Sequence, residues 1–384
     1  MFMRSLFLSF VILLTIGSMV AQDIEGQWNG LLKVQGMQLR IVFHVTKTTD
    51  GYTSTMDSPD QGAMGMPVTT TTYTAPTIRF EIIQIGFVYE GKVQDNRIVG
   101  SLTQRGQAFP LDLSRDEVKK EEILRPQVPV EPYPYKSEEV TFRNASADIT
   151  LAGTLTLPDQ EGQFPAVILI TGSGPQDRDE SLLGHKPFLV LSDYLTRQGI
   201  AVLRYDDRGV GKSSGAFENA TSADFATDAQ SAVKYLMSRL DIDHMHIGLL
   251  GHSEGGIIAP MVASQSKDVA FIVLLAGTGI RGDSLLLLQQ KLILKASGAS
   301  DADLQQSEET NSRFFKLILE NENQDALKEL VTKELTKVYR EMTDEEKQGI
   351  TEEEWIDMEI EQMLSPWMEF FIRYDPAPTL KKVM

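Results

Sequence analysis

The chain contains no cysteine, which excludes disulfides, thiolate metal ligands and lipid attachment at a cysteine. Positive charge is also scarce, because 36 lysines and arginines stand against 54 aspartates and glutamates, for a net charge of -18. Such a surface repels phosphate groups, so nucleic acid is not an expected partner. Histidine is limited to five residues, His44, His185, His244, His246 and His252. Any acid–base chemistry that needs an imidazole must use one of these.

The one long apolar run lies at the N-terminus. Arg4 precedes apolar residues 6–16, and small residues continue to Ala21. This order is typical of a secretory signal peptide over residues 1–21, cleaved after Ala21. An uncleaved anchor is the alternative, but the run is shorter than the ~20 apolar residues that a bilayer requires. We therefore expect an exported protein, periplasmic or secreted, without a stable membrane span after cleavage; the sequence does not indicate an oligomeric state.

Residues 22–115 alternate short β-rich runs with glycine and polar turns. In "LRIVFHV" the apolar residues Leu39, Ile41, Phe43 and Val45 recur every second position, which predicts an antiparallel strand with one buried face. We expect a small antiparallel β domain, with His44 pointing outward. Residues 116–137 carry four prolines in "RPQVPVEPYPY" and predict a stiff linker.

Residues 138–384 change to alternating strands and helices. Apolar runs such as "FPAVILI" and "IAVLRY" are typical of strands that are buried on both faces, and the segments between them have helical patterns. These features predict an α/β domain with a mostly parallel sheet. Residues 281–372 lack strand patterns and read as a helical lid inserted over the carboxyl edge of the sheet. The acidic run at residues 352–354 is interpreted as the solvated start of a helix.

The stretch "IGLLGHSEGGIIAP" places Ser253 between Gly251 and Gly255, after an apolar strand and before a helix of small residues. A sharp turn at this junction lifts a serine hydroxyl clear of the sheet and makes it a candidate nucleophile. Two backbone N–H groups are candidate oxyanion donors: that of Glu254, directly after the serine, and that of Ser173 in the loop "TGSGP".

Two other patterns are weaker. "DDRGVGKSSG" ends like a phosphate-binding loop, but that motif requires a glycine where the chain has Asp206. Asp207 and Arg208 are therefore expected to brace the loop. His244 and His246 form a pair without a third metal ligand, and we expect neither a metal nor an organic cofactor.

Several stretches together resemble exported bacterial α/β-hydrolases of the EstD esterase type, which carry a small N-terminal β domain. They are "RPQVPVEPYPY", "LITGSGPQDRDE", "GHKPFLVLSDYLTRQGIAVLRYDDRGVGKS", "GHSEGG" and "SPWMEFFIRYDPAPTLKKV". The resemblance spans residues 125–384 and implies ester hydrolysis through an acyl-serine, with a triad in the order serine, acid, histidine. No histidine follows Ser253, so the chain is expected to stop before the acid and the histidine of that triad.

His252 is adjacent to Ser253 and is expected to point to the opposite face, which leaves His185 as the other candidate imidazole near the pocket. A sheet without its last strands should expose an apolar edge near "VAFIVLLAG" and invite pairing with another chain. The sequence therefore predicts a serine hydrolase acting on a small ester, with low activity in this chain because a serine without a base is a weak nucleophile. Two alternatives remain: a serine aminopeptidase that takes short peptides, and a non-catalytic envelope binding protein.

Overall fold

The computed structural model describes residues 23–383, except 35–36, 50, 62, 105–106, 121–124, 183, 344–346 and 348–349. The predicted signal peptide, residues 1–21, lies outside the described residues. The chain divides into two compact units, one ending at Glu122 and the other beginning at Ile123. The division falls within the predicted linker, residues 116–137.

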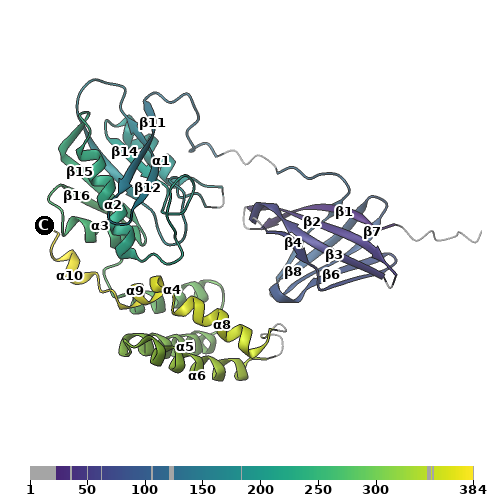
Figure 1. The fold of residues 1–384 in the computed structure, drawn as a ribbon. Coiled ribbons are helices and arrows are strands. Elements are labelled where there is room, and N and C mark those ends of the chain that lie inside the picture. Colours follow the sequence, from purple (N-terminus) through teal and green to yellow (C-terminus); the bar gives the residue numbers. More distant parts are fainter. Residues whose placement is uncertain are drawn as a thin grey trace, which may run out of the picture. The chain divides into compact units, whose positions relative to one another are not determined.

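The first unit contains the predicted antiparallel β domain (Figure 1). Its strands are β1 (Gly26–Val34), β2 (Met37–Thr48), β3 (Gly51–Ser58), β4 (Ala63–Pro67), β5 (Thr70–Thr74), β6 (Thr77–Ile82), β7 (Phe87–Gln94), β8 (Arg97–Gln104), β9 (Gln107–Pro110) and β10 (Leu113–Ser114). They form one sheet in the order β4-β3-β2-β1-β10-β8-β7-β6-β5, with β9 paired to β8. Ile41, Phe43 and Val45 of β2 are buried, as their spacing predicts. Phe43 and Phe80 stack at the centre of the core, with ring centroids 4.1 Å apart.

The second unit contains a six-stranded mixed sheet. Its strands are β11 (Lys136–Asn144), β12 (Ile149–Leu157), β13 (Phe164–Ile170), β14 (Ala201–Tyr205), β15 (Ile242–His252) and β16 (Phe271–Leu275), in the order β11-β12-β14-β13-β15-β16. β11 and β12 are antiparallel, β12 also pairs antiparallel with β14, and the other pairs are parallel. Crossovers between parallel strands need helices, which cover both faces of the sheet.

Alternate residues of β13 face the two helical layers. Val167 packs with Phe188 of α1 (Pro187–Arg197) on one face. Ile168 packs on the other face with the apolar residues of α2 (Ser222–Met237) and α3 (Gly255–Ala263). Both faces of β13 are thus packed against helices, and the candidate site lies at the carboxyl ends of the strands.

The described residues between 281 and 380 form helices joined by short connections. The helices are α4 (Gly282–Ala296), α5 (Asp301–Glu320), α6 (Gln324–Glu341), α8 (Glu352–Met363), α9 (Pro366–Arg373) and α10 (Ala377–Leu380). The acidic run starts α8, where Thr351 and Glu354 form a reciprocal capping box. In Figure 1, α4 and α9 lie nearer the sheet than α5 and α6, and Phe371 of α9 packs on Ile257 of α3. Among the described helices, none combines the length and apolar character needed to cross a membrane.

Candidate active site

Ser253 lies at the sharp turn between β15 and α3. Its backbone has a φ of +51°, the left-handed region that side chains other than glycine rarely adopt. The turn is held by the Ser253 N–H donating to the carbonyl of Leu275 at 2.9 Å and by the Gly256 N–H donating to the Ser253 carbonyl at 2.9 Å. A strained, over-determined backbone at a strand end is the geometry that presents a nucleophile.

The flanking glycines are required by close backbone contacts. A Cβ at Gly251 would lie 1.9 Å from the carbonyl oxygen of Gly255, and a Cβ at Gly255 would lie 2.3 Å from the carbonyl oxygen of Ile170. Neither contact can be relieved by rotating a side chain, because both partners are backbone atoms. The G-x-S-x-G pattern is therefore explained by the packing of α3 against the ends of β13 and β15.

Ser253 opens into a cavity of about 430 Å³. One wall is polar and is formed mainly by the loop after β13 and the end of β15, with Ser173, Gln176, Glu180 and His252. The opposite wall is apolar and comes from the helices α3, α4 and α9, with Ile257, Leu285, Leu286, Trp367 and Phe371. The volume is that of a small-molecule site, and the helical segment supplies Leu285, Leu286, Trp367 and Phe371 to its apolar lining.

Two candidate backbone donors belong to residues that line this cavity. Among the described residues, neither the N–H of Ser173 nor that of Glu254 has a hydrogen-bond acceptor. Both residues line the cavity beside Ser253. Free N–H groups from two separate loops next to a nucleophile are what an oxyanion hole requires.

The side chain of Glu254 ties three parts of the domain together. Its Oε1 accepts hydrogen bonds from the Ser222 hydroxyl at the start of α2, at 2.6 Å, and from the indole N–H of Trp367 in α9, at 2.8 Å. Burial raises the pKa of Glu254, while these donors and a hydrogen bond from Ser173 oppose the rise. The sequence predicted only a backbone role for Glu254, since nothing local indicates that residues 222 and 367 converge on it.

A second buried carboxyl, Asp207, lies behind the oxyanion loop. It accepts hydrogen bonds from the Thr171 hydroxyl at 2.8 Å and from the Gln176 N–H at 3.0 Å. Burial raises the pKa of Asp207 to about 7, and the nearby charges of Glu254 and Asp228 add to the rise. Asp207 thus braces both ends of the loop that carries Ser173.

His252 lines the same cavity as Ser253, contrary to the expectation that it points to the opposite face. The left-handed backbone at Ser253 ends the strand alternation on which that expectation depended. The Nδ1 of His252 is 2.7 Å from Glu180 Oε1, which also accepts the N–H of Gly172 at 2.8 Å. Among the described residues, the Ser253 hydroxyl has no hydrogen bond to this or any other imidazole.

The remaining histidines lie elsewhere. His185 is exposed, is not among the residues lining the Ser253 cavity, and has a ring nitrogen 2.7 Å from the Arg125 guanidinium. His246 pairs with Asp243 at 2.7 Å, and His244 lies 2.8 Å from the carbonyl of Arg239. His44, half-buried, pairs with Asp57 at 2.8 Å. Within the part of the chain that the structure describes, no group of three or more possible metal ligands occurs.

The loop at residues 206–212 is held by ion pairs. The guanidinium of Arg178 donates two hydrogen bonds to the carboxylate of Asp206, from Nε at 3.0 Å and from Nη2 at 2.8 Å. Arg208 pairs with Asp228 at 2.7 Å, and the Lys212 ammonium pairs with Glu139 at 3.0 Å. Lys212 is thus engaged at the surface, and the loop has a bracing role.

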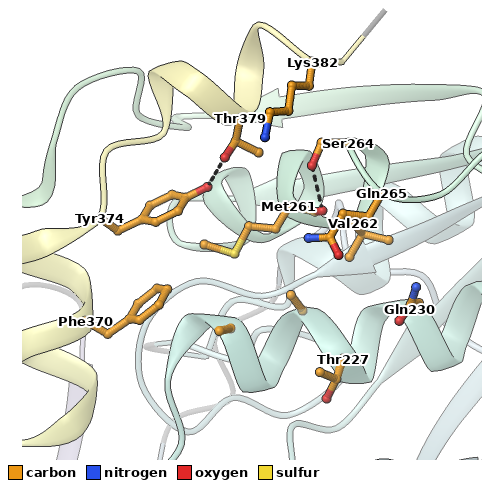
Figure 2. Close-up of a pocket in the computed structure, with 12 residues that line it drawn as sticks. Thr227, Gln230, Met261, Val262, Ser264, Gln265, Phe370, Tyr374, Thr379 and Lys382 are labelled. Atoms are coloured by element: carbon orange, nitrogen blue, oxygen red, sulfur yellow. Dashed lines mark hydrogen bonds between the residues drawn. The ribbon is translucent and has the colours of Figure 1, made fainter.

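Figure 2 shows a different cavity, of about 450 Å³, between α2, α3, α9 and the residues around α10. Its lining includes Gln230, Met261 and Phe370, and the Tyr374 hydroxyl donates to Thr379 at 2.7 Å. Among its described lining residues, no carboxylate or imidazole adjoins a nucleophile. The cavity at Ser253 is therefore the candidate active site.

Comparison with known proteins agrees with this choice. Residues 187–338, which include Ser253, match the family described as serine aminopeptidase, S33. The chain is 34% identical to the esterase EstD of Thermotoga maritima over 138 residues, which are 36% of this chain and 32% of that protein. It is 30% identical to the human acyl-coenzyme A thioesterase 1 over 128 residues, covering 33% of this chain and 27% of that protein.

The chain spans about a third or less of the length of these curated relatives. A solved esterase structure from Pyrococcus furiosus aligns with 41% of this chain and 55% of its own, at 22% identity and a TM-score of 0.34. The matched family and these two curated relatives are described as a peptidase, an esterase and a thioesterase, which are all hydrolases.

Proposed function

We propose that the protein is a serine hydrolase that cleaves small-molecule carboxylic esters through an acyl-serine at Ser253. The observation that carries the proposal is the pair of free N–H groups, those of Ser173 and Glu254, beside a serine held in the left-handed conformation. A site with oxyanion donors next to a half-buried serine that opens into a cavity is suited to acyl transfer. No step of this reaction needs a metal or an organic cofactor.

In the first step the Ser253 hydroxyl oxygen bonds to the ester carbonyl carbon, and the carbonyl oxygen becomes an anion facing the two N–H groups. The serine proton passes to solvent water, because no imidazole is hydrogen-bonded to the hydroxyl among the described residues, and the departing alkoxide takes a proton from water as the carbon–oxygen bond breaks. Water then attacks the acyl-serine in the same way and releases the acid. The apolar wall from α3, α4 and α9 receives the acyl group, so that residues 281–372 act as a lid over the site.

Turnover by this chain is expected to be slow. The Ser253 hydroxyl has no imidazole partner among the described residues, and a serine without a base is a weak nucleophile. The oxyanion hole and substrate binding alone leave ~10³- to 10⁴-fold acceleration over water. His252, held by Glu180, is the imidazole nearest in sequence, and its replacement by glutamine tests whether it accepts the proton.

An aminopeptidase is the second candidate, because the matched family carries that description. An aminopeptidase must hold the positive α-amino group of a peptide, which calls for a carboxylate in the site. Among the described lining residues, the carboxylates Glu180 and Glu254 are already engaged, Glu180 by His252 and Glu254 by Ser222 and Trp367. The cavity therefore favours a neutral ester over a peptide with a free amine.

The test is intact-mass analysis after treatment with a fluorophosphonate, which adds a phosphonyl group to an activated serine. We expect a single adduct on the purified chain and none on Ser253→Ala. Hydrolysis of p-nitrophenyl acetate in preference to amino-acid p-nitroanilides then separates an esterase from a peptidase. An unlabelled chain would instead support a non-catalytic binding protein.

We further propose that the protein is exported, with residues 1–21 as the leader. Arg4 and the apolar run that follows support this proposal. The mass of the N-terminal peptide of protein purified from an envelope fraction should begin at Gln22. Retention of Met1 in that peptide would contradict cleavage.

A further inference from the structure

A second cavity adjoins the one at Ser253. It has a volume of about 380 Å³ and lies among α4, α5, α8 and α9, the helices of the segment 281–380. Leu286 and Gln289 line both cavities, so the two meet on one face of α4. Leu286 also belongs to the apolar clusters of both regions, the one around Phe371 and the one around Ile372. We call this second cavity the distal chamber.

The distal chamber is mainly apolar. Its lining includes Ile293, Phe315, Ile318, Met363 and Met368. Two polar lining groups satisfy each other, since the Asn311 amide donates to Gln290 at 2.5 Å. Methionines and branched aliphatic side chains around an irregular space adapt to flexible hydrocarbon.

Charge in the distal chamber argues against a polar occupant. Glu359 is its one ionisable lining residue among those described, and burial raises the pKa of Glu359. The described lining residues thus offer no cation to a phosphate or a carboxylate. An anionic headgroup is excluded, whereas a hydrocarbon tail is accommodated.

The length of the distal chamber can be estimated along α4. From Leu286 to Leu294 the helix advances ~12 Å at 1.5 Å per residue. An extended polypeptide backbone advances ~3.4 Å for every three covalent bonds. An extended hydrocarbon chain has a similar rise per bond, so about ten carbon–carbon bonds span the ~12 Å from Leu286 to Leu294. Only an acyl chain that first crosses the cavity at Ser253 would reach it.

We propose that the acyl chain of an ester bound at Ser253 continues past Leu286 into the distal chamber. The enzyme then acts on esters of acyl chains of about twelve carbons or more in preference to acetyl esters. The inference rests on the proposed function of Ser253, and it assigns a substrate class to that site. The helices α4, α5, α8 and α9 thus determine which acyl-chain lengths are preferred, in addition to covering the site.

The experiment measures the rate at which alkyl fluorophosphonates with two-, six- and twelve-carbon chains label Ser253 of the full chain. Burying one methylene is worth about a fourfold gain. Because the distal chamber is open to solvent on one side, we expect the twelve-carbon probe to label at least tenfold faster than the six-carbon probe.

Two variants fill the distal chamber. Met363→Trp places a large ring inside it, and Ile293→Trp does so at its rim, where the native side chain is 57% exposed and we expect the fold to tolerate substitution. Each should lower the twelve-to-two-carbon rate ratio at least fivefold. The matched control is Met358→Trp on the same helix as Met363, since Met358 is 58% exposed and lies outside the lining.

The ratio of rates makes the result independent of a general loss of folded protein. If Met363→Trp and Ile293→Trp keep the wild-type ratio, the acyl chain does not enter the distal chamber and the inference is wrong. If the two-carbon probe fails to label the wild type, the proposed function fails instead. Binding of dodecanoate to the Ser253→Ala protein, measured by calorimetry, then still tests the distal chamber. Adding Met363→Trp to this protein should weaken the binding of dodecanoate, and adding Met358→Trp should not.

Discussion

Replacing Trp367 by phenylalanine isolates one hydrogen bond between the helical segment and the candidate oxyanion hole. The change removes the indole N–H, which lies 2.8 Å from Glu254 Oε1, and keeps an aromatic ring to stack on Phe371 at 5.0 Å between centroids. Glu254 retains its hydrogen bond from Ser222, so the carboxyl is not orphaned. A hydrogen bond of this kind contributes about 1.5 kcal/mol. We expect the melting temperature to fall by roughly 3–6 °C.

The same variant should slow phosphonylation of Ser253 about fivefold, or ~1 kcal/mol in barrier, because the N–H of Glu254 loses part of its orientation. The apparent affinity for the probe should change less than the maximal rate, since the ring remains in the wall. Loss of the donor also raises the pKa of Glu254 further, so any pH midpoint in the labelling rate should move upward.

The matched control is Trp355→Phe. Trp355 packs against Tyr339 within the helical segment, with centroids 5.7 Å apart, and does not line the cavity. Its replacement should leave the labelling rate unaltered. Equal labelling rates and pH profiles for Trp367→Phe and Trp355→Phe would refute the view that the helical segment positions the oxyanion donor.

Three further outcomes are expected. Gly251→Ala should abolish labelling and destabilise the second unit in thermal melts, because the new Cβ would lie 1.9 Å from the Gly255 carbonyl oxygen; a fully active variant would exclude the close-packed turn. Burial raises the pKa of Asp207 in the folded protein to about 7. The contribution of the Asp207 carboxyl to the free energy of unfolding is therefore present below pH ~4 and is lost as the pH rises towards 7. The melting temperature of Asp207→Asn should consequently rise relative to that of the wild type between pH 5 and 8. A pH-independent difference would contradict that sign. β16 ends the described sheet with Val273 38% exposed, so Val273→Lys should reduce concentration-dependent association in sedimentation velocity; identical profiles for variant and wild type would show that this edge does not associate.

Much of the local structure follows from short-range patterns. The period-two spacing in β2 predicts its buried face, and the apolar runs of β13 and β14 predict strands covered on both sides. The glycines around Ser253 predict the sharp turn, because backbone contacts forbid a Cβ there. Prediction was wrong for His252, since alternation along a strand does not continue through a residue with a φ of +51°.

The sequence by itself determined the order of strands and helices, the turn at Ser253 and the absence of thiol chemistry, because these depend on neighbouring residues and on composition. Only the tertiary structure decided the surroundings of that serine. Glu180 meets His252 across 72 positions, and Trp367 meets Glu254 across 113 positions. The alignment of two cavities along α4 likewise requires four helices to pack. Contacts at such separations depend on how whole elements pack, which no local spacing of residues encodes.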